Sequence, residues 1–332
     1  MDLNILWFFL IATLFSGFFF LEGFDFGVGM LTITGKSDHD RRLILNSVGH
    51  VWDGNEVWLL TAGGAMFAAF PGWYATMFSG FYIALTLVLL SLIVRGVTFE
   101  FRSKYASSKW RGLWDKIIAV SNLLPPLLIW VAVANLAQGT PIDADQNYVG
   151  TFFNLLSPYT LSVGLLGLFY SLYNGALYLT LKLDDPIKSD MKKKARLFGA
   201  LLLVFGIVAA VYHIFVFKMG MIPLLILLVA LVCEILAVGL TWLNKSTKLS
   251  FFLNMFGVVF LVFSVFAMLF PNVMVSSLDA AYNLTIYNVA SGPYTLKVMS
   301  IVAVILIPIV LLYTGWTYWV FRGRLKTEDI NH

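Results

Sequence analysis

Residues 52–58 read Trp52-Asp53-Gly54-Asn55-Glu56-Val57-Trp58, and they open an apolar run long enough to cross a lipid bilayer. A charged carboxylate inside a membrane helix costs roughly 2.5–3.5 kcal/mol even on lenient insertion scales. Asp53 and Glu56 therefore need a counter-charge, a proton or a path to water. A second pair with the same spacing, Glu22 and Asp25, lies in the preceding apolar run. Because residues three apart share one face of a helix, each pair points in one direction.

The composition indicates an integral membrane protein. Of 332 residues, 60% are hydrophobic and only 12% are charged, whereas soluble domains carry about 25% charged residues. The single cysteine, Cys233, excludes an internal disulfide and a cysteine-ligated cluster. No two of the four histidines are spaced for a paired metal site on one helix, and we expect no metal site in this chain.

Each helical crossing needs about 20 apolar residues, and the chain contains nine such runs. The predicted spans are Ile5–Ile33, Val51–Phe70, Tyr74–Val94, Lys116–Ala137, Tyr159–Leu181, Leu197–Phe217, Ile222–Leu243, Phe251–Phe270 and Lys297–Phe321. The first run follows no basic segment, so we expect it to be retained as a span and not cleaved as a signal peptide.

The predicted fold is therefore an all-α polytopic membrane protein, and residues 1–332 are expected to form a single integral membrane domain with nine transmembrane helices. We expect residues 1–138 to form a first four-helix bundle, residues 159–270 a second one, and residues 297–321 a peripheral ninth helix. The longest connections, 138–158 and 271–296, contain turn-forming residues and are expected to be short re-entrant or capping loops.

The basic residues predict the orientation. Every lysine and arginine except Lys218 and Lys297 falls at one end of the expected bundle, within the segments 35–50, 95–116, 182–196, 244–250 and 322–332. The positive-inside rule then places the N-terminus outside and the C-terminus in the cytoplasm. The run 192–194 is interpreted as an orientation and headgroup determinant, and we expect no nucleic-acid partner.

With this orientation, all four carboxyls lie toward the cytoplasmic side, where they could form a ladder reaching roughly 10 Å into the membrane. Arg95, at the inner end of the third expected span, is a natural counter-ion, and His50 could feed protons to Asp53. We expect Asp53, Glu56, Asp25, Glu22, Arg95 and His50 to form a proton pathway. The alternative is a polar cluster that only ties helices together, with His50 a plain residue at the start of a helix.

Other residues allow two interpretations. Glu234, an isolated acid in the seventh span, is either protonated and structural or meets a partner subunit or a cofactor. His213 fits a satisfied interfacial histidine better than a haem ligand. Glycines near the acids are expected to let helices approach closely, namely Gly17, Gly23, Gly27, Gly29, Gly54, Gly63 and Gly64. No residue of this chain is expected to be catalytic or to bind a cofactor by itself.

The motif at residues 52–58 and its continuation through 61–71 and 78–82 strongly resemble subunit II of the cytochrome bd-type quinol oxidases. The resemblance extends to Gly23–Gly29, Arg95 with 101–104, 125–126 with 135–139, 295–299 and 307–313. It covers residues 5 to about 325, and the motif of the second span is specific to that family.

The resemblance implies a heterodimer with a haem-bearing subunit I, which holds two b haems, haem d and the quinol site. Together the subunits would oxidise quinol and reduce dioxygen to water in a bacterial cytoplasmic membrane, drawing protons from the cytoplasm. The proposed proton-route role of the acid in the family's motif carries over to Asp53, with Glu56, Asp25 and Arg95 as neighbours. Some members hold a structural quinone in subunit II, and a small single-span accessory subunit is compatible with the resemblance.

Two other functions stay open at this point. An ion-coupled secondary transporter would suit intramembrane acids and kinked helices, but the inverted repeats expected of one are not visible. The chain could also be a purely structural scaffold for the haem subunit, without a role in proton flow.

Overall fold

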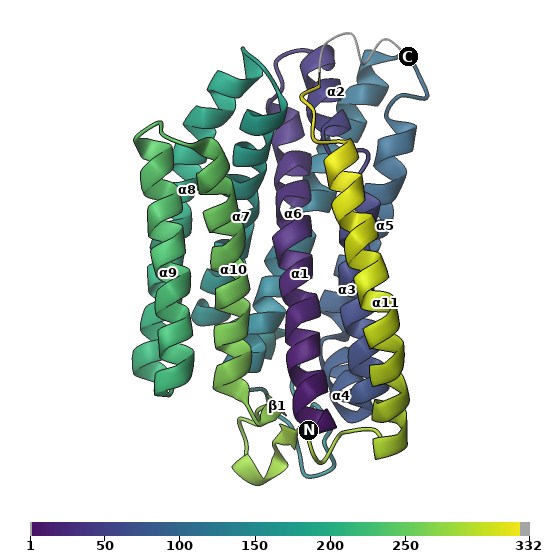
Figure 1. Ribbon diagram of the computed structural model, residues 1–332, viewed down its shortest axis with the longest axis vertical. Helices are drawn as coiled ribbons and strands as arrows, with labels where there is room; N and C mark the ends of the chain where they lie inside the picture. Colours follow the sequence, from purple (N-terminus) through teal and green to yellow (C-terminus); the bar gives the residue numbers. More distant parts are fainter. Residues whose placement is uncertain (1, 326–332) are drawn as a thin grey trace.

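A computed structural model describes residues 2–325 of the chain, and it is almost entirely helical. The helices are α1 (Leu3–Leu31), α2 (Asp38–Asn46), α3 (Trp52–Ala69), α4 (Pro71–Gly80), α5 (Tyr82–Phe101), α6 (Ser108–Gln138), α7 (Pro158–Lys182), α8 (Ile187–Val211), α9 (Met221–Trp242), α10 (Thr247–Leu269) and α11 (Pro293–Val320). Most run along the long axis of the molecule (Figure 1). The N-terminus and β1 (Asn272–Met274) lie at one end, which we call the β1 end, and α2 lies at the other, the α2 end.

Eight helices are long and apolar enough to cross a membrane, which bears out the prediction of a polytopic membrane protein. The eight do not include α3, which has 18 residues. Asp53, Asn55 and Glu56 lie in its first turns and lower its hydropathy.

The third predicted span is interrupted, which corrects the expectation of one helix over Tyr74–Val94. The chain forms two helices, α4 and α5, with a break at Phe81. A Cβ on Gly80 would meet Cβ of Tyr148 at 2.7 Å, so a connection from the β1 end approaches the chain closely where α4 ends. This long-range contact has no signal in the local sequence.

Helix α1 is central to the arrangement. It contacts α3, α6, α7, α10 and α11, and it runs through the middle of the molecule in Figure 1. Its crossing with α7 is the tightest, because a Cβ on Gly27 would overlap the carbonyl of Ser171 and lie 2.9 Å from Cα of Gly175. Two glycines at one crossing let the helix backbones touch. Helix α11 is different, since among its residues only Leu296 is buried.

The two long connections pair with each other at the β1 end. Thr140 donates its backbone N–H to Val275 O at 2.9 Å, and Ser277 donates to Thr140 O at 2.8 Å. Strand β1 pairs antiparallel with β2 (Leu284–Thr285). Short 3₁₀ turns at Phe152–Leu155 and Ala280–Tyr282 complete these segments. The sequence predicted either re-entrant or capping loops. The hydrogen bonds between the two connections are those of a cap at the β1 end.

A network of ion pairs fastens the α2 end. Arg102, at the end of α5, binds Asp115 of α6 at 2.6 Å and Asp38 of α2 at 2.8 Å. Arg41 also binds Asp115, at 2.7 Å, and Arg111 binds Asp38 at 2.6 Å. Partial burial disfavours ionised Asp38, but hydrogen bonds and charge from the two arginines outweigh it and hold the pKa of Asp38 below its ordinary value. The network therefore joins α2, α5 and α6 through ion pairs between charged aspartate and arginine side chains.

Candidate functional site

Three of the four predicted acids meet around one arginine in the half of the bundle nearer the α2 end. Helix α1 supplies Glu22 and Asp25, α3 supplies Glu56, and α5 supplies Arg95. Arg95 Nη1 pairs with Glu22, and both side chains are fully buried. The same nitrogen lies 3.3 Å from Glu56 Oε2. Arg95 is thus the counter-ion that the sequence indicated.

Aromatic rings hold the guanidinium in place. The Arg95 guanidinium lies 4.9 Å from the ring centroid of Phe26 and 5.4 Å from that of Trp52. Trp52 in turn stacks on Phe99 at 4.8 Å. A cation near an aromatic face is attracted by the ring quadrupole, and the attraction grows when water is excluded. The arginine is therefore fixed both by carboxylates and by rings from α1 and α3.

Asn55 is a site residue that the sequence reasoning missed. It is buried, and its Nδ2 donates to Asp25 Oδ2 at 2.6 Å. Its Oδ1 accepts a hydrogen bond from the Tyr318 hydroxyl of α11 at 2.8 Å. The available signal was its position between Asp53 and Glu56, because an amide in a membrane helix also needs partners. Tyr318, more than 260 residues away, left no such signal.

Asp53 and His50 do not join this cluster. Asp53 is exposed on α3, and its side chain has no hydrogen bond or ion pair within residues 2–325. His50 is exposed at the α2 end, where its ring stacks on Phe321 at 4.4 Å. The expected ladder of four acids is therefore only partly formed. The side chain of Glu56 points toward Arg95, whereas that of Asp53 is exposed on the surface of the chain.

The cluster brings three carboxyls and one guanidinium together, with Glu22, Asp25 and Arg95 buried and Glu56 partly exposed. With all groups ionised it would carry a surplus of negative charge, and uncompensated charge inside a membrane is costly. Glu22 Oε2, Asp25 Oδ1 and two Arg95 nitrogens also have no hydrogen-bond partner among the described residues. Such a cluster can bind protons or water molecules at these atoms.

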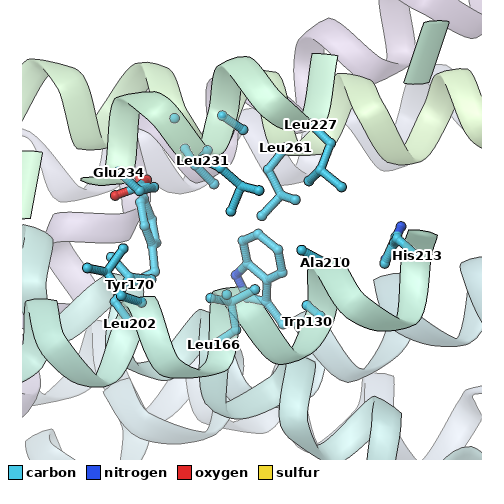
Figure 2. Close-up of a pocket in the computed structure, with 16 residues that line it drawn as sticks. Trp130, Leu166, Tyr170, Leu202, Ala210, His213, Leu227, Leu231, Glu234 and Leu261 are labelled. Carbon is cyan, nitrogen blue, oxygen red and sulfur yellow. The ribbon is translucent and has the colours of Figure 1, made fainter. Parts of the chain in front are cut away.

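Glu234 stands apart from the acid cluster, as the sequence suggested. It lines an apolar cavity of about 50 Å³ between α6, α7, α8, α9 and α10, with Tyr170 beside it and His213 at the far end (Figure 2). The carboxyl occupies the space that a Cβ on Gly257 would need. His213 is buried, and its Nε2 shares a hydrogen bond with the Tyr159 hydroxyl at 2.8 Å. Its Nδ1 has no partner among the described residues, so the expectation of a satisfied histidine holds for only one of the two ring nitrogens.

The glycines divide into two groups. A Cβ on Gly17 would overlap Trp58, and one on Gly29 would overlap Asn122, so the glycines of α1 do permit close contacts. The expectation was wrong for α3 within this chain, because a Cβ on Gly54, Gly63 or Gly64 would meet nothing within 4 Å. Over residues 2–325, no group of three or more His, Cys, Asp or Glu side chains could hold a metal ion.

A second cavity, of about 540 Å³, is larger and almost wholly apolar. Side chains of α1, α3, α4, α5, α6 and α10 line it, among them Trp73, Leu92 and Phe266. It lies beside Gly63 and Gly64 of α3. A cavity of this size and lining can take a large apolar ligand.

Comparison with known proteins shows which fold and which family this chain has. The fold matches a solved bd oxidase from Geobacillus thermodenitrificans with a TM-score of 0.75 at 16% identity, covering 97% of this chain and 99% of that one. The chain is thus a multi-span membrane protein with the bd oxidase fold.

The model of the family "Cytochrome bd terminal oxidase subunit II" matches residues 3–321, and the chain belongs to that family. It is 41% identical to cytochrome bd ubiquinol oxidase subunit 2 of Bacillus subtilis, over 99% of this chain and 98% of the relative. It is 36% identical to cytochrome bd-I ubiquinol oxidase subunit 2 of Escherichia coli, over 99% and 96%. The protein is therefore a transmembrane subunit of a respiratory oxidoreductase complex.

Proposed function

We propose that this chain is the haem-free subunit II of a terminal oxidase that oxidises quinol and reduces dioxygen to water. Its partner is a haem-bearing subunit I, which supplies the two b haems, haem d and the chemistry of electron transfer. Family membership and the ubiquinol oxidase names of the relatives support this assignment. No observation favours the ion-coupled transporter.

We further propose that the buried cluster carries protons from the cytoplasmic side toward subunit I. The supporting observation is that Glu22, Asp25 and Glu56 converge with a single arginine in the membrane interior. A cluster built only to join helices would be better served by balanced charge, since each unpaired charge weakens the assembly. Surplus carboxyls instead provide atoms where a proton can bind and leave.

The proposed topology has nine spans: the eight helices that are apolar enough to cross a membrane, and α3, which is counted as a span despite its acids. The N-terminus and the β1 end lie outside, and the α2 end lies in the cytoplasm, in agreement with the distribution of lysine and arginine. In this proposal α1 to α6 form the first four-helix bundle, in which α4 and α5 together make one span. Helices α7 to α10 form the second bundle, and α11 is the peripheral helix.

Asp53 is proposed to face subunit I. It belongs to an exposed stripe of α3 that also contains Gly54, Val57, Leu60 and Gly64. Open glycines on a membrane helix favour contact with another helix, and a carboxylate left facing lipid would be costly. Subunit I would cover this stripe, and Asp53 would pass protons from Glu56 across the interface.

The cavity of about 540 Å³ is the proposed place for the structural quinone that some family members hold. Its apolar lining suits an isoprenoid tail, and aromatic rings such as Trp73 and Phe266 suit a quinone ring. The role would be structural, because the acid cluster does not line this cavity.

The substitution Asp25→Asn tests the proton route in the purified complex. Haem content should stay at the parental level, while quinol oxidase turnover falls about tenfold or more, since positioned proton transfer is worth at least that much. Asp145→Asn, in an exposed connection at the β1 end, is the matched control and should change neither quantity. Full turnover of Asp25→Asn with complete haem content would leave the chain as a scaffold.

A further inference from the structure

A pocket of about 190 Å³ with both polar and apolar side chains in its lining lies at the α2 end, apart from the acid cluster. It is bounded by the α2–α3 connection with His50, the end of α7 with Lys182, and the end of α11 with Tyr318. A buried water needs roughly 10–15 Å³ of such space and two to four polar partners. The pocket therefore has room and hydrogen-bonding groups for several water molecules.

Two side chains separate this pocket from the acid cluster. Tyr318 lines the pocket, and its hydroxyl donates to Asn55 Oδ1 at 2.8 Å. Asn55 Nδ2 then donates to Asp25 Oδ2 at 2.6 Å. Tyr178, which also lines the pocket, stacks on Phe24 next to Asp25 at 4.3 Å between ring centroids. Only the side chains of Asn55 and Tyr318 thus lie between the buried carboxyl of Asp25 and the pocket.

This connection is closed to protons as it stands. The amide of Asn55 uses its NH₂ as a donor to Asp25 and its oxygen as an acceptor from Tyr318. An amide that passed a proton along this line would have to become an imidic acid, unlike a carboxyl or a water molecule. Water reaches Asp25 only if Tyr318 leaves Asn55. Asp25 Oδ1, which has no partner among the described residues, is then the atom that such water can bind.

Helix α11 packs loosely against the rest of the chain between Leu296 and Tyr318. Among α11 residues only Leu296, at the opposite end, is buried. Pro308 lies between Leu296 and Tyr318 and removes a backbone hydrogen bond from the middle of the helix. Beyond Tyr318 the chain is held, because Lys182 Nζ donates to Phe321 O and Gly323 O and Arg324 pairs with Asp184 at 2.7 Å. The hydrogen bond to Asn55 therefore opens by rotation of the Tyr318 side chain and not by a shift of the end of α11.

We propose that the pocket beside His50 and Tyr318 is the proton intake of this subunit, and that the Tyr318–Asn55 hydrogen bond is its gate. This inference rests on the proposed proton route, and it replaces the expectation that His50 feeds Asp53. Protons enter as hydrated protons, pass the gate when Tyr318 releases Asn55, and bind Asp25. Tyr318 is a positioning residue, because it acts through Asn55.

The intake is tested by plugging the pocket. Cys233→Ser provides a chain without thiols, and Asn46→Cys then places one thiol at the pocket rim. In inside-out vesicles, a bulky cationic methanethiosulfonate should lower turnover of Asn46→Cys about tenfold, as expected for a blocked proton-transfer path. Ser189→Cys, exposed at the start of α8 outside the pocket, is the matched control and should keep its turnover when labelled. Unchanged turnover of fully labelled Asn46→Cys overturns the intake.

The gate is tested by Tyr318→Phe, which keeps the ring and removes the hydrogen bond. At alkaline pH, where proton supply limits the rate, its turnover should rise about threefold, which corresponds to one hydrogen bond of ordinary net strength. A pH profile equal to that of the parent complex, or a lower turnover at alkaline pH, overturns the gate. Asp25→Asn separates the two proposals: if it retains full turnover, the route itself fails, whereas a defect in Asp25→Asn without an effect of plugging removes only the intake.

Discussion

Glu22 of α1 and Arg95 of α5 form an ion pair in which neither side chain is exposed. The pair connects the central helix to a helix on its flank, and Glu56 of α3 approaches the same guanidinium nitrogen at 3.3 Å. The contact between α1, α3 and α5 at this point therefore depends on the positive charge of Arg95.

Arg95→Gln should destabilise the protein by about 3–5 kcal/mol, because it leaves carboxylates buried without their partner. We expect a lower apparent Tm and a lower yield of the assembled complex. The double substitution Glu22→Gln with Arg95→Gln should recover much of the loss, since two neutral amides can hydrogen-bond to each other. A single Arg95→Gln variant as stable as the parent would contradict the assignment of this pair as a structural link.

Gly27→Val should prevent the close crossing of α1 and α7, where a Cβ already overlaps the Ser171 carbonyl. Overpacking of this kind costs about 1–3 kcal/mol or more, and the apparent Tm of the complex should fall. Gly239→Ala in α9 is the control, because its Cβ would meet nothing within 4 Å. That substitution should leave the Tm unchanged or raise it. Equal Tm values for the two variants would argue against the tight crossing.

The network around Asp38 predicts loss of stability in acid. Arg102 and Arg111 hold the pKa of Asp38 below its ordinary value of 3.8, against the opposing effect of partial burial. Its contribution is complete above pH 3.8 and is lost as the pH falls through the lower pKa of the folded state. Asp38→Asn should lower the Tm at neutral pH, and the difference from the parent should shrink below about pH 4. A constant difference down to pH 2 would contradict the ion-pair account.

Asp53→Arg should weaken association with subunit I, because it reverses a charge on the exposed stripe of α3. Asp53→Asn, which removes the charge but keeps the size, should assemble normally. Co-purification of the haem-bearing partner with a tagged chain measures the difference. Asp145→Arg is the charge-reversal control away from α3. If Asp53→Arg assembles as well as the parent, the stripe faces lipid or another subunit.

Much of the architecture could be predicted from the sequence. Long apolar runs define membrane helices locally, so eight of the predicted spans correspond to helices that can cross a membrane. The two pairs of acids and Arg95 were visible because charge is rare in such runs. The family could be recognised from the motif at residues 52–58, and the comparisons confirmed it.

The remaining features depend on how helices are rotated and on contacts between distant segments. The hydrophobic periodicity could not predict that Glu56 approaches Arg95 while Asp53 is exposed. Beyond its first turns α3 is apolar on every face, so the sequence does not show which face is buried. The partners of Asn55 and Asp115 are far along the chain or on other helices. The glycines of α1 and α3 look alike in sequence, yet only those of α1 lie at helix crossings within the chain.

The helices leave the ribosome in the order of the sequence, so α1 emerges well before α5. Glu22 is synthesised 73 residues before Arg95, its partner. At about 5–20 residues per second, the nascent first helix waits several seconds with unbalanced acids. During that interval an ionised carboxylate in lipid would cost roughly 2.5–3.5 kcal/mol, so its acids are better protonated or near water until α5 emerges. The ion pair that buries Glu22 can form only after the guanidinium of Arg95 has been synthesised.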